Sequence, residues 1–319
     1  MPMSGGNELH VVVGTGAVGS AVIRALAQRG ARVRAVNRRG AADVPEGVEV
    51  TAGDATDHDS VIASCRGASV VYHCANAPYT EWPSKFPPIM HGIIVGAEAA
   101  GARLVFADNL YGYGAVAGPL TEDLPYDATG PKGQTRAHVA ETLMEAHAMG
   151  KVRATIGRSS DFFGPGVRQS HMGERVFEPI LTGKPASVLG RLDVPHTYTF
   201  IDDFAVGLVT LGEQDAALGE AWHIPSGETV TTGQFLDVVF REAGGNARAR
   251  TLPKLMFSIL ARFHPLLREL KETLYQVQQP FVVDHGKYER AFGANPTPHD
   301  EAIRRTIEWY RAVQRALLE

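Results

Sequence analysis

Short apolar runs alternate with amphipathic stretches along the first half of the chain. The runs have the length of buried strands and lie at 9–13, 31–36, 48–52, 68–73, 102–107 and 152–157. The stretches between them are long enough for helices, and 132–150 places apolar Val139, Leu143 and Ala146 on one side. This alternation predicts repeated β–α–β units, and therefore an α/β fold in which a parallel sheet carries helices on both faces.

The first apolar run leads into a glycine-rich turn that opens a helix-like stretch. The turn reads Gly14-Thr15-Gly16-Ala17-Val18-Gly19. Gly14 permits a tight turn, Gly16 lets the backbone approach a pyrophosphate, and Gly19 lets the helix pack against the strand. The helix N-terminus favours an anion through its unpaired N–H groups and its dipole. The turn predicts a dinucleotide site in a doubly wound Rossmann sheet, and the alternative is an ordinary glycine-rich turn.

The second apolar run ends in a basic turn, Asn37-Arg38-Arg39-Gly40. A site specific for NAD carries a carboxylate about 20 residues past the glycines, where it binds the ribose 2′-OH. This chain has Asn37 there instead, and the two guanidinium groups that follow can clamp a 2′-phosphate. The turn therefore favours NADP(H) over NAD(H), and the alternative is a solvated basic turn.

Two later runs also end in candidates for cofactor contact. Asp54 and Ala55 follow the third run, where a carboxylate can accept a hydrogen bond from the adenine amine, and Asp57 suits the N-cap of the next helix. Ala75 and Asn76 follow the fourth run, where small residues let the backbone approach the cofactor.

The regular alternation fades after the Gly-Pro-Gly sequence at 164–166. We therefore expect a dinucleotide-binding Rossmann domain at 1–166 and a smaller, mainly substrate-binding region at 167–319 that is interleaved with late Rossmann elements. Within it, 252–275 has the pattern of an amphipathic helix or helix pair interrupted at Pro265, which fits a core or dimer surface better than a membrane-binding one. Residues 1–8 are expected to be a disordered lead-in.

Composition and charge exclude several classes of partner. Lys and Arg total 31 against 35 Asp and Glu, a net charge of −4 that argues against nucleic acid. No apolar run reaches the roughly 18 residues of a membrane span, and no signal peptide opens the chain. The two cysteines, Cys65 and Cys74, have no CxxC spacing and favour a reduced, cytoplasmic compartment. The twelve histidines show no metal-ligand spacing, so we expect no metal. The partner that we expect is a small-molecule substrate.

Taken together, these segments resemble an extended or atypical short-chain dehydrogenase/reductase of the NAD-dependent epimerase/dehydratase type. The resemblance covers nearly the whole chain and includes, besides the glycine turn, Gly53-Asp54, 106–109, Tyr113-Gly114, 158–166, 198–204 and 222–227. Ser160, within 158–166, is a further cofactor-binding candidate. The resemblance implies the Rossmann fold, a nicotinamide cofactor and a homodimer.

The chain departs from this family at its active-site positions. The family pairs a tyrosine with a lysine four residues later and adds an upstream serine or threonine. Here Lys132, Arg136 and Asn109 stand at those positions. Lys132 and Arg136 share a helix face, so their repulsion favours a Lys132 that can lose its proton and act as acid or base. Arg136 could hold the nicotinamide ribose and Asn109 an oxyanion, and the alternative is that both cations bind an acidic substrate or lie on a solvated face.

Aromatic residues near the same positions are the other candidates. Tyr111 has no match in the family and is the candidate for a relocated proton donor, while Tyr113 matches a tyrosine used for packing and substrate shape. Tyr79 and Trp82 lie in an aromatic, proline-containing loop that would line the substrate site, and the alternative is an ordinary surface loop.

Three functions remain open from the sequence. The first is an NADP(H)-dependent reductase or dehydrogenase that acts on a small carbonyl, hydroxyl or activated alkene through a non-standard proton relay. The second is an epimerase, isomerase or lyase that uses the nicotinamide transiently. The third is a non-catalytic redox sensor that binds NADP(H).

Overall fold

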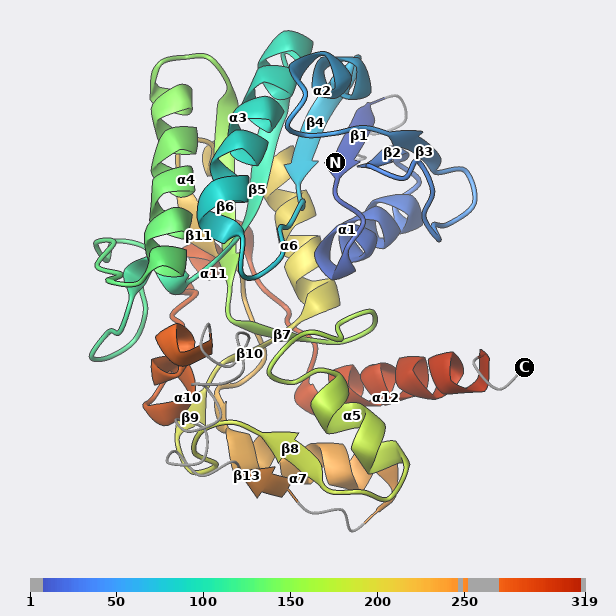
Figure 1. The fold of residues 1–319 in the computed structure, drawn as a ribbon, viewed down its shortest axis with the longest axis vertical. Helices are drawn as coiled ribbons and strands as arrows, with labels where there is room; N and C mark the ends of the chain where they lie inside the picture. The colour runs from blue at the N-terminus through green and yellow to red at the C-terminus, as the bar shows by residue number, and fades with distance from the viewer. Residues whose placement is uncertain (1–7, 246–248, 252–269, 317–319) are drawn as a thin grey trace.

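The computed structural model describes residues 8–245, 249–251 and 270–316 of the 319-residue chain. Its centre is a seven-stranded sheet in the order β11-β6-β5-β4-β1-β2-β3, and every neighbouring pair is parallel (Figure 1). The strands of the sheet are β1 (Leu9–Val13), β2 (Arg32–Asn37), β3 (Glu49–Ala52), β4 (Ala68–His73), β5 (Arg103–Asn109), β6 (Arg153–Ser159) and β11 (Ala221–His223).

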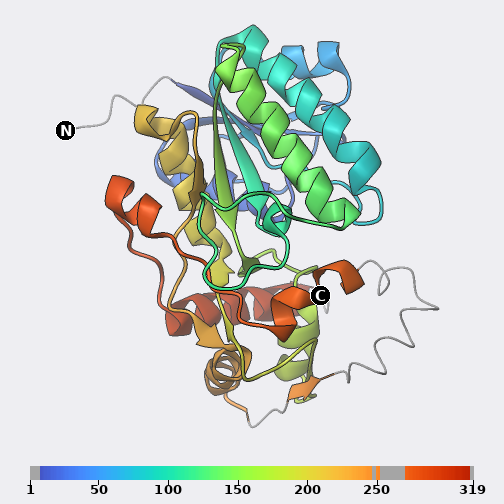
Figure 2. The same ribbon diagram turned by 90° about the vertical axis from the view of Figure 1, so that its left-hand side faces the viewer.

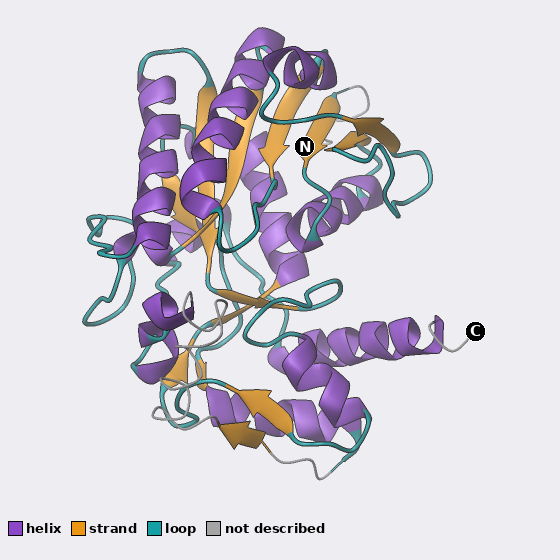
Figure 3. Cartoon of the chain, in the orientation of Figure 1, coloured by secondary structure: helices purple, strands orange, loops and turns teal. Residues whose placement is uncertain are grey.

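Helices cover both faces of this sheet, as Figure 3 shows. One face packs against α1 (Ala17–Gln28) and α6 (Ile201–Glu213). The other packs against α2 (His58–Cys65), α3 (Trp82–Ala100) and α4 (Pro131–Ala148). Strands that are buried on both faces carry near-continuous apolar runs, and all five residues of β1 are buried. The arrangement confirms the predicted doubly wound α/β fold.

A second group of elements lies beyond the end of the sheet to which β4, β5 and β6 run (Figures 1 and 2). Its core joins α5, α7 and α12 to short strands. Helix α11 (Gly286–Phe292) packs on β11. The remaining described elements, among which η marks a 3-10 turn, are η1 (Tyr111–Tyr113), β7 (Asp161–Phe163), α5 (Glu174–Leu181), β8 (Ala186–Val188), β9 (Pro195–His196), β10 (Tyr198–Phe200), η2 (Asp215–Ala217), β12 (Val230–Thr231), α7 (Thr232–Ala243), β13 (Ala249–Thr251), η3 (Lys271–Thr273), α10 (Tyr275–Gln278) and α12 (His299–Ala316).

The six strands predicted from the apolar runs all form, with bounds that differ only slightly from the runs, and the helix predicted at 132–150 is α4. The seventh strand, β11, is too short to show a period of its own. β11 adds the seventh strand to the sheet and α6 covers one of its faces, and both come from the chain beyond residue 166. The helix expected over 252–275 and the lead-in at 1–8 lie almost wholly outside the described residues; what is described of 252–275 at its end is η3 and the start of α10.

Candidate functional site

The glycine turn joins β1 to α1 and leaves an open space at the start of the helix. Gly14 has φ +100°, and a Cβ built on it would lie 2.6 Å from the backbone of Ala75. A Cβ on Gly19 would lie 1.8 Å from the carbonyl oxygen of Gly14. A Cβ on Gly16 would meet nothing within 4 Å. Gly14 and Gly19 are therefore required by packing, whereas Gly16 borders free space.

The N-terminus of α1 faces that space without a cap of its own. Gly16 is the N-cap residue and supplies no side-chain cap, and the first turn holds no acidic residue. The first N–H groups of a helix have no partner within the helix. The residues present therefore fit a dinucleotide, whose pyrophosphate would accept hydrogen bonds at this helix end.

The turn after β2 is built around the amide of Asn37. Its Oδ1 accepts hydrogen bonds from the backbone N–H groups of Arg39 and Gly40, each at 2.9 Å, and its Nδ2 donates to Thr15 Oγ1 at 2.8 Å. The amide therefore shapes the basic turn and ties it to the glycine turn. Arg38 and Arg39 are exposed, and neither forms an ion pair with another described residue.

The residues that follow β3 lie near the same end of the sheet as the glycine turn. Asp54 Oδ1 accepts hydrogen bonds from the backbone and hydroxyl of Thr56, and these bonds hold the pKa of the Asp54 carboxyl below its usual range. Asp57 caps α2 as predicted, because its Oδ1 accepts from Ser60 N at 3.2 Å. The Ala55 carbonyl packs so closely against α3 that only a glycine fits opposite it, at Gly92.

Three further cofactor candidates follow β4 and β6. Asn76 Oδ1 accepts a hydrogen bond from the Ala77 backbone at 2.9 Å, and the Ala75 backbone packs against Gly14. Ser160 follows the last residue of β6 and is 6% exposed, and its hydroxyl has no hydrogen-bond partner among the described residues. A buried polar atom without a partner is uncommon, and a bound ligand is one way to satisfy it.

A buried ion network lies beneath the ends of β5 and β6. Asp108 accepts hydrogen bonds from Arg136 Nε at 2.8 Å and from Arg158 Nε at 3.0 Å, and the side chains of all three are at most 6% exposed. The Arg136 guanidinium also stacks 4.6 Å from the ring centre of Phe86 and 4.9 Å from that of Phe106. Burial lowers the pKa of Arg158, but the charge of Asp108, the phenols of Tyr113 and Tyr126 and the hydrogen bond to Asp108 together raise it above its usual value.

The network continues into Tyr113 and His223. Arg158 donates hydrogen bonds to the Tyr113 hydroxyl at 2.6 Å and to the Tyr126 hydroxyl. His223 Nδ1 donates to the Asp284 carbonyl, so its Nε2 is the acceptor and receives a hydrogen bond from the Tyr113 hydroxyl at 3.0 Å. Burial lowers the pKa of His223 to about 3, with a smaller contribution from the Arg158 charge. Tyr113 is 1% exposed. In this arrangement Tyr113 is packed inside the network, and Arg136 is bound to Asp108.

Lys132 lies at the start of α4 and is paired with a residue from the C-terminal part of the chain. Glu272 Oε1 accepts hydrogen bonds from the backbone N–H groups of Lys132 and Gly133, at 2.9 and 3.0 Å, and its Oε2 lies 3.8 Å from Lys132 Nζ. The ammonium also lies 4.6 Å from the ring centre of Tyr79. Because Lys132 and Arg136 each have a carboxylate, the expected repulsion between them is largely compensated.

Aromatic residues of the segment after β4 pack against Lys132, Arg136 and Tyr111. Trp82 is 6% exposed, donates its indole N–H to the Ala77 carbonyl at 3.1 Å and stacks on Tyr111. Tyr79 lies edge-on to Trp82. Burial raises the pKa of both the Tyr79 and Tyr111 phenols, so both remain protonated hydrogen-bond donors near neutral pH. Asn109, at the end of β5, accepts a hydrogen bond from Tyr111 N at 3.0 Å through its Oδ1.

Sequence reasoning missed an acid and a histidine that the fold brings together. Asp161 begins β7 directly after Ser160, and its Oδ2 lies 3.0 Å from His196 Nε2 on β9. Burial by itself raises the pKa of the Asp161 carboxyl, but the contact with His196 and the charges of His196 and His171 lower it below its usual value. The sequence does show that Asp161 follows the sixth apolar run, but no local pattern connects this residue to His196.

The candidate residues converge because adjacent strands end at the same edge of the sheet. Tyr79, Tyr111 and Asp161 follow β4, β5 and β6, which are neighbours in the sheet, and the glycine turn follows β1 beside β4. The carboxyl ends of parallel strands, at the point where the strand order reverses, form the crevice in which such sheets bind ligands.

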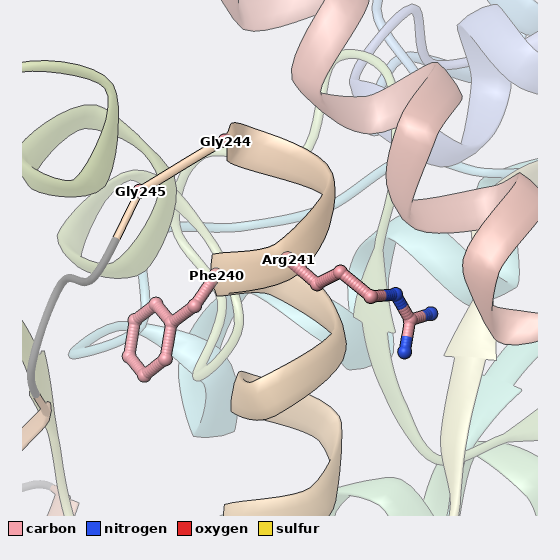
Figure 4. A pocket seen from close by; sticks show the side chains of 4 residues that line it. All are labelled: Phe240, Arg241, Gly244 and Gly245. Atoms are coloured by element: carbon pink, nitrogen blue, oxygen red, sulfur yellow. The ribbon is translucent and has the colours of Figure 1, made fainter.

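Other features of the described structure do not form a competing site. Figure 4 shows a hollow at the C-terminal end of α7, lined by Phe240, Arg241, Gly244 and Gly245. It contains none of the candidate residues, and Arg241 pairs with Glu242 at 3.2 Å. Within 8–245, 249–251 and 270–316, no group of three or more His, Cys, Asp or Glu residues is arranged to hold a metal ion. The same ranges hold no helix long and apolar enough to cross a membrane.

Comparison with known proteins identifies the family. Residues 11–224 match the NAD dependent epimerase/dehydratase family, and the chain belongs to that family. It is 24% identical to the mouse (Mus musculus) protein sterol-4-alpha-carboxylate 3-dehydrogenase, decarboxylating, covering 98% of this chain and 93% of that protein. It is 26% identical to the dTDP-glucose 4,6-dehydratase of Mycobacterium tuberculosis, covering 86% of this chain and 81% of that protein.

Solved structures show the same fold. An epimerase from Methanothermobacter thermautotrophicus superposes with a TM-score of 0.81 at 19% identity and covers 98% of this chain and 94% of its own. The UDP-glucose 4-epimerase of Thermus thermophilus, solved in complex with NAD, superposes with a TM-score of 0.74 at 19% identity, covering 95% of this chain and 99% of its own. Dehydrogenases, dehydratases and epimerases therefore all occur among the similar proteins.

Proposed function

We propose that this protein is an NADP(H)-dependent oxidoreductase that transfers a hydride to or from a small carbonyl, hydroxyl or activated-alkene substrate. The observation that carries the cofactor preference is the turn after β2, where an amide replaces the carboxylate of an NAD site and two exposed arginines follow it. An amide does not repel a 2′-phosphate, and a guanidinium binds one with charge-assisted hydrogen bonds.

The residues that would hold the cofactor come from separate strand ends. The free N–H groups of α1 beside Gly16 would bind the pyrophosphate, Arg38 and Arg39 the 2′-phosphate, and Asp54 the adenine amine. The unpaired hydroxyl of Ser160 would meet the cofactor near the end of β6. When bound, the nicotinamide supplies the hydride.

The substrate would lie between the strand ends and the second group of elements. The Tyr79 and Tyr111 phenols remain protonated and would donate hydrogen bonds to a substrate oxygen, as would the Asn109 amide. Lys132, neutralised by Glu272, would hold the Tyr79 ring and orient this group of donors. These donors differ from the tyrosine–lysine pair that short-chain dehydrogenases/reductases use to move a proton, so the proposed proton relay is non-standard.

An epimerase or dehydratase is the second candidate, because several similar proteins carry those names. Such an enzyme returns its nicotinamide to the starting state in each turnover and consumes none. Net and stoichiometric oxidation of NADPH by a carbonyl substrate therefore supports the oxidoreductase.

The test is to follow the absorbance of NADPH while the full-length protein is incubated with a panel of aldehydes, ketones and enones. We expect at least one of them to oxidise NADPH in proportion to product formed. If none does, and the protein instead converts a nucleotide sugar while its nicotinamide remains unchanged, the second candidate replaces the first.

A further inference from the structure

Asp161 and His196 form a largely buried acid–histidine pair beside the candidate substrate site. Their facing atoms, Oδ2 and Nε2, are 3.0 Å apart, and Nε2 is buried without an aligned hydrogen bond to any described residue. His196 Nδ1 lies 3.1 Å from the carbonyl oxygen of Gln276. A carbonyl oxygen only accepts, so Nδ1 must carry a hydrogen. A neutral His196 would then turn a lone pair toward a carboxylate, and a proton at Nε2 removes that repulsion.

The carboxylate is the member of the pair that reaches the site. The Asp161 side chain is 18% exposed, whereas that of His196 is 1% exposed. His196 is also held from both sides by rings, at 4.5 Å from Tyr198 and 5.3 Å from Phe281 between ring centres. His196 is therefore fixed behind Asp161, and a substrate would meet the carboxylate first.

The surroundings of Asp161 are those of the proposed substrate site. Among the described residues, its charge interacts with His196 and also with His171, Tyr79, Tyr111, Tyr198 and Tyr275. Tyr79 and Tyr111 follow the two strands next to the one that Asp161 follows. The Tyr79 and Tyr111 phenols are hydrogen-bond donors that keep their protons, whereas Asp161 and His196 face each other through one carboxylate oxygen and one ring nitrogen, between which a proton can pass.

We propose that Asp161 delivers the proton that carbonyl reduction requires, and that His196 is the positioning residue that supplies it. The proposal rests on the proposed oxidoreductase function. The His196 Nε2–H bond would break as its proton passes to the Asp161 carboxylate, which leaves His196 neutral. As a hydride supplied by NADPH forms the new C–H bond, the C=O π electrons would move to oxygen, and that oxygen would take the proton from Asp161, which becomes a carboxylate again. After the alcohol leaves, Asp161 takes a proton from water and returns it to Nε2.

The first test reads the proton directly and needs no substrate. Full-length protein carrying ¹⁵N-histidine is compared by NMR at pH 7 with Asp161→Asn, and His196→Gln assigns the His196 signals. We expect both ring nitrogens of His196 to be protonated in the wild type and only Nδ1 in Asp161→Asn. Asp193→Asn, an exposed carboxylate paired with Arg191, should leave the spectrum unchanged. A neutral His196 in the wild type would overturn the proposal.

The second test measures the rate with the panel carbonyl that the wild type reduces fastest. Asp161→Asn should slow a single turnover of NADPH oxidation about 10²- to 10⁴-fold, the usual contribution of a general acid, while its NADPH dissociation constant stays within about twofold of wild type. His196→Gln should slow it comparably, and the double variant should be no slower than Asp161→Asn, because the two act in one relay. Additive losses would indicate a merely structural role.

The two proposals fail in different ways. If Asp161→Asn keeps the wild-type rate, the proton role is overturned and the oxidoreductase stands. If the wild type oxidises no NADPH with any member of the panel, the oxidoreductase fails and the proton role fails with it.

Discussion

Replacing Asp108 with alanine would leave two buried guanidinium groups facing each other without a carboxylate. Arg136 and Arg158 each donate to Asp108, and the side chains of all three are nearly inaccessible to water. Removing one member of a buried ion pair costs about 3–5 kcal/mol of folding stability, because the remaining charge cannot recover its hydration. Here one carboxylate serves two cations, so we expect Asp108→Ala to lie at the upper end of that range.

The comparison variant is Asp215→Ala. Asp215 pairs with Arg103 at 2.5 Å, a geometry as close as that of the buried pair, but its side chain is 78% exposed. Exposed ion pairs contribute about 0–1 kcal/mol. Both variants remove a carboxylate from a close ion pair, so the difference between them measures the combined effect of burial and of the second cation that Asp108 serves.

Thermal and urea unfolding, followed by circular dichroism, give the two stability losses. At roughly 2 °C per kcal/mol for a large domain, we expect Asp108→Ala to lower Tm by about 6–10 °C and Asp215→Ala by about 2 °C or less. Asp108→Asn keeps the side-chain volume and one acceptor, so it should fall between them and remains measurable if the alanine variant does not fold. Equal losses for Asp108→Ala and Asp215→Ala would refute the assignment of the network.

Two further predictions concern acid stability and the glycine turn. Burial lowers the pKa of both His73 and His223 to about 3, against about 6.5 in an unfolded chain. Below pH 6.5 the unfolded state binds protons that the folded state does not, so the free energy of unfolding falls between about pH 6.5 and 3. At pH 5 each histidine lowers that free energy by about 2 kcal/mol. Equal urea midpoints at pH 7.5 and pH 5 would contradict this prediction. Gly19→Ala should destabilise the protein, because its Cβ would overlap the Gly14 carbonyl. Gly16→Ala should instead leave Tm unchanged and weaken dinucleotide binding, because a Cβ there meets no other atom. An equal loss of Tm in the two variants would show that Gly16 is also required for packing.

Features made within a few residues could be predicted from the sequence. The six strands from β1 to β6 carry apolar runs that give both their type and their position. The glycine turn, the turn at Asn37 and the Asp57 cap each depend on contacts between neighbours in the chain, so their residue types reveal them.

The chemistry of the site depends instead on contacts between distant parts of the chain. Glu272 and the Lys132 backbone are 140 residues apart, and Arg136 and Asp108 are 28 apart. Spacing on one helix suggested that Lys132 and Arg136 act on each other. The fold gives each its own carboxylate, because side chains on one helix face can still be turned toward different partners.

The dissociation constants of NADPH and NADH test the central claim most directly. They are to be measured for the wild type, for Arg38→Ala, and for Arg32→Ala, which removes an exposed arginine from the opposite end of β2. A charge-assisted hydrogen bond contributes about 1.5–3 kcal/mol. We therefore predict that the wild type prefers NADPH and that Arg38→Ala weakens NADPH about 10- to 100-fold while NADH binding and the Arg32→Ala variant stay unchanged. Equal or tighter binding of NADH by the wild type would contradict the account.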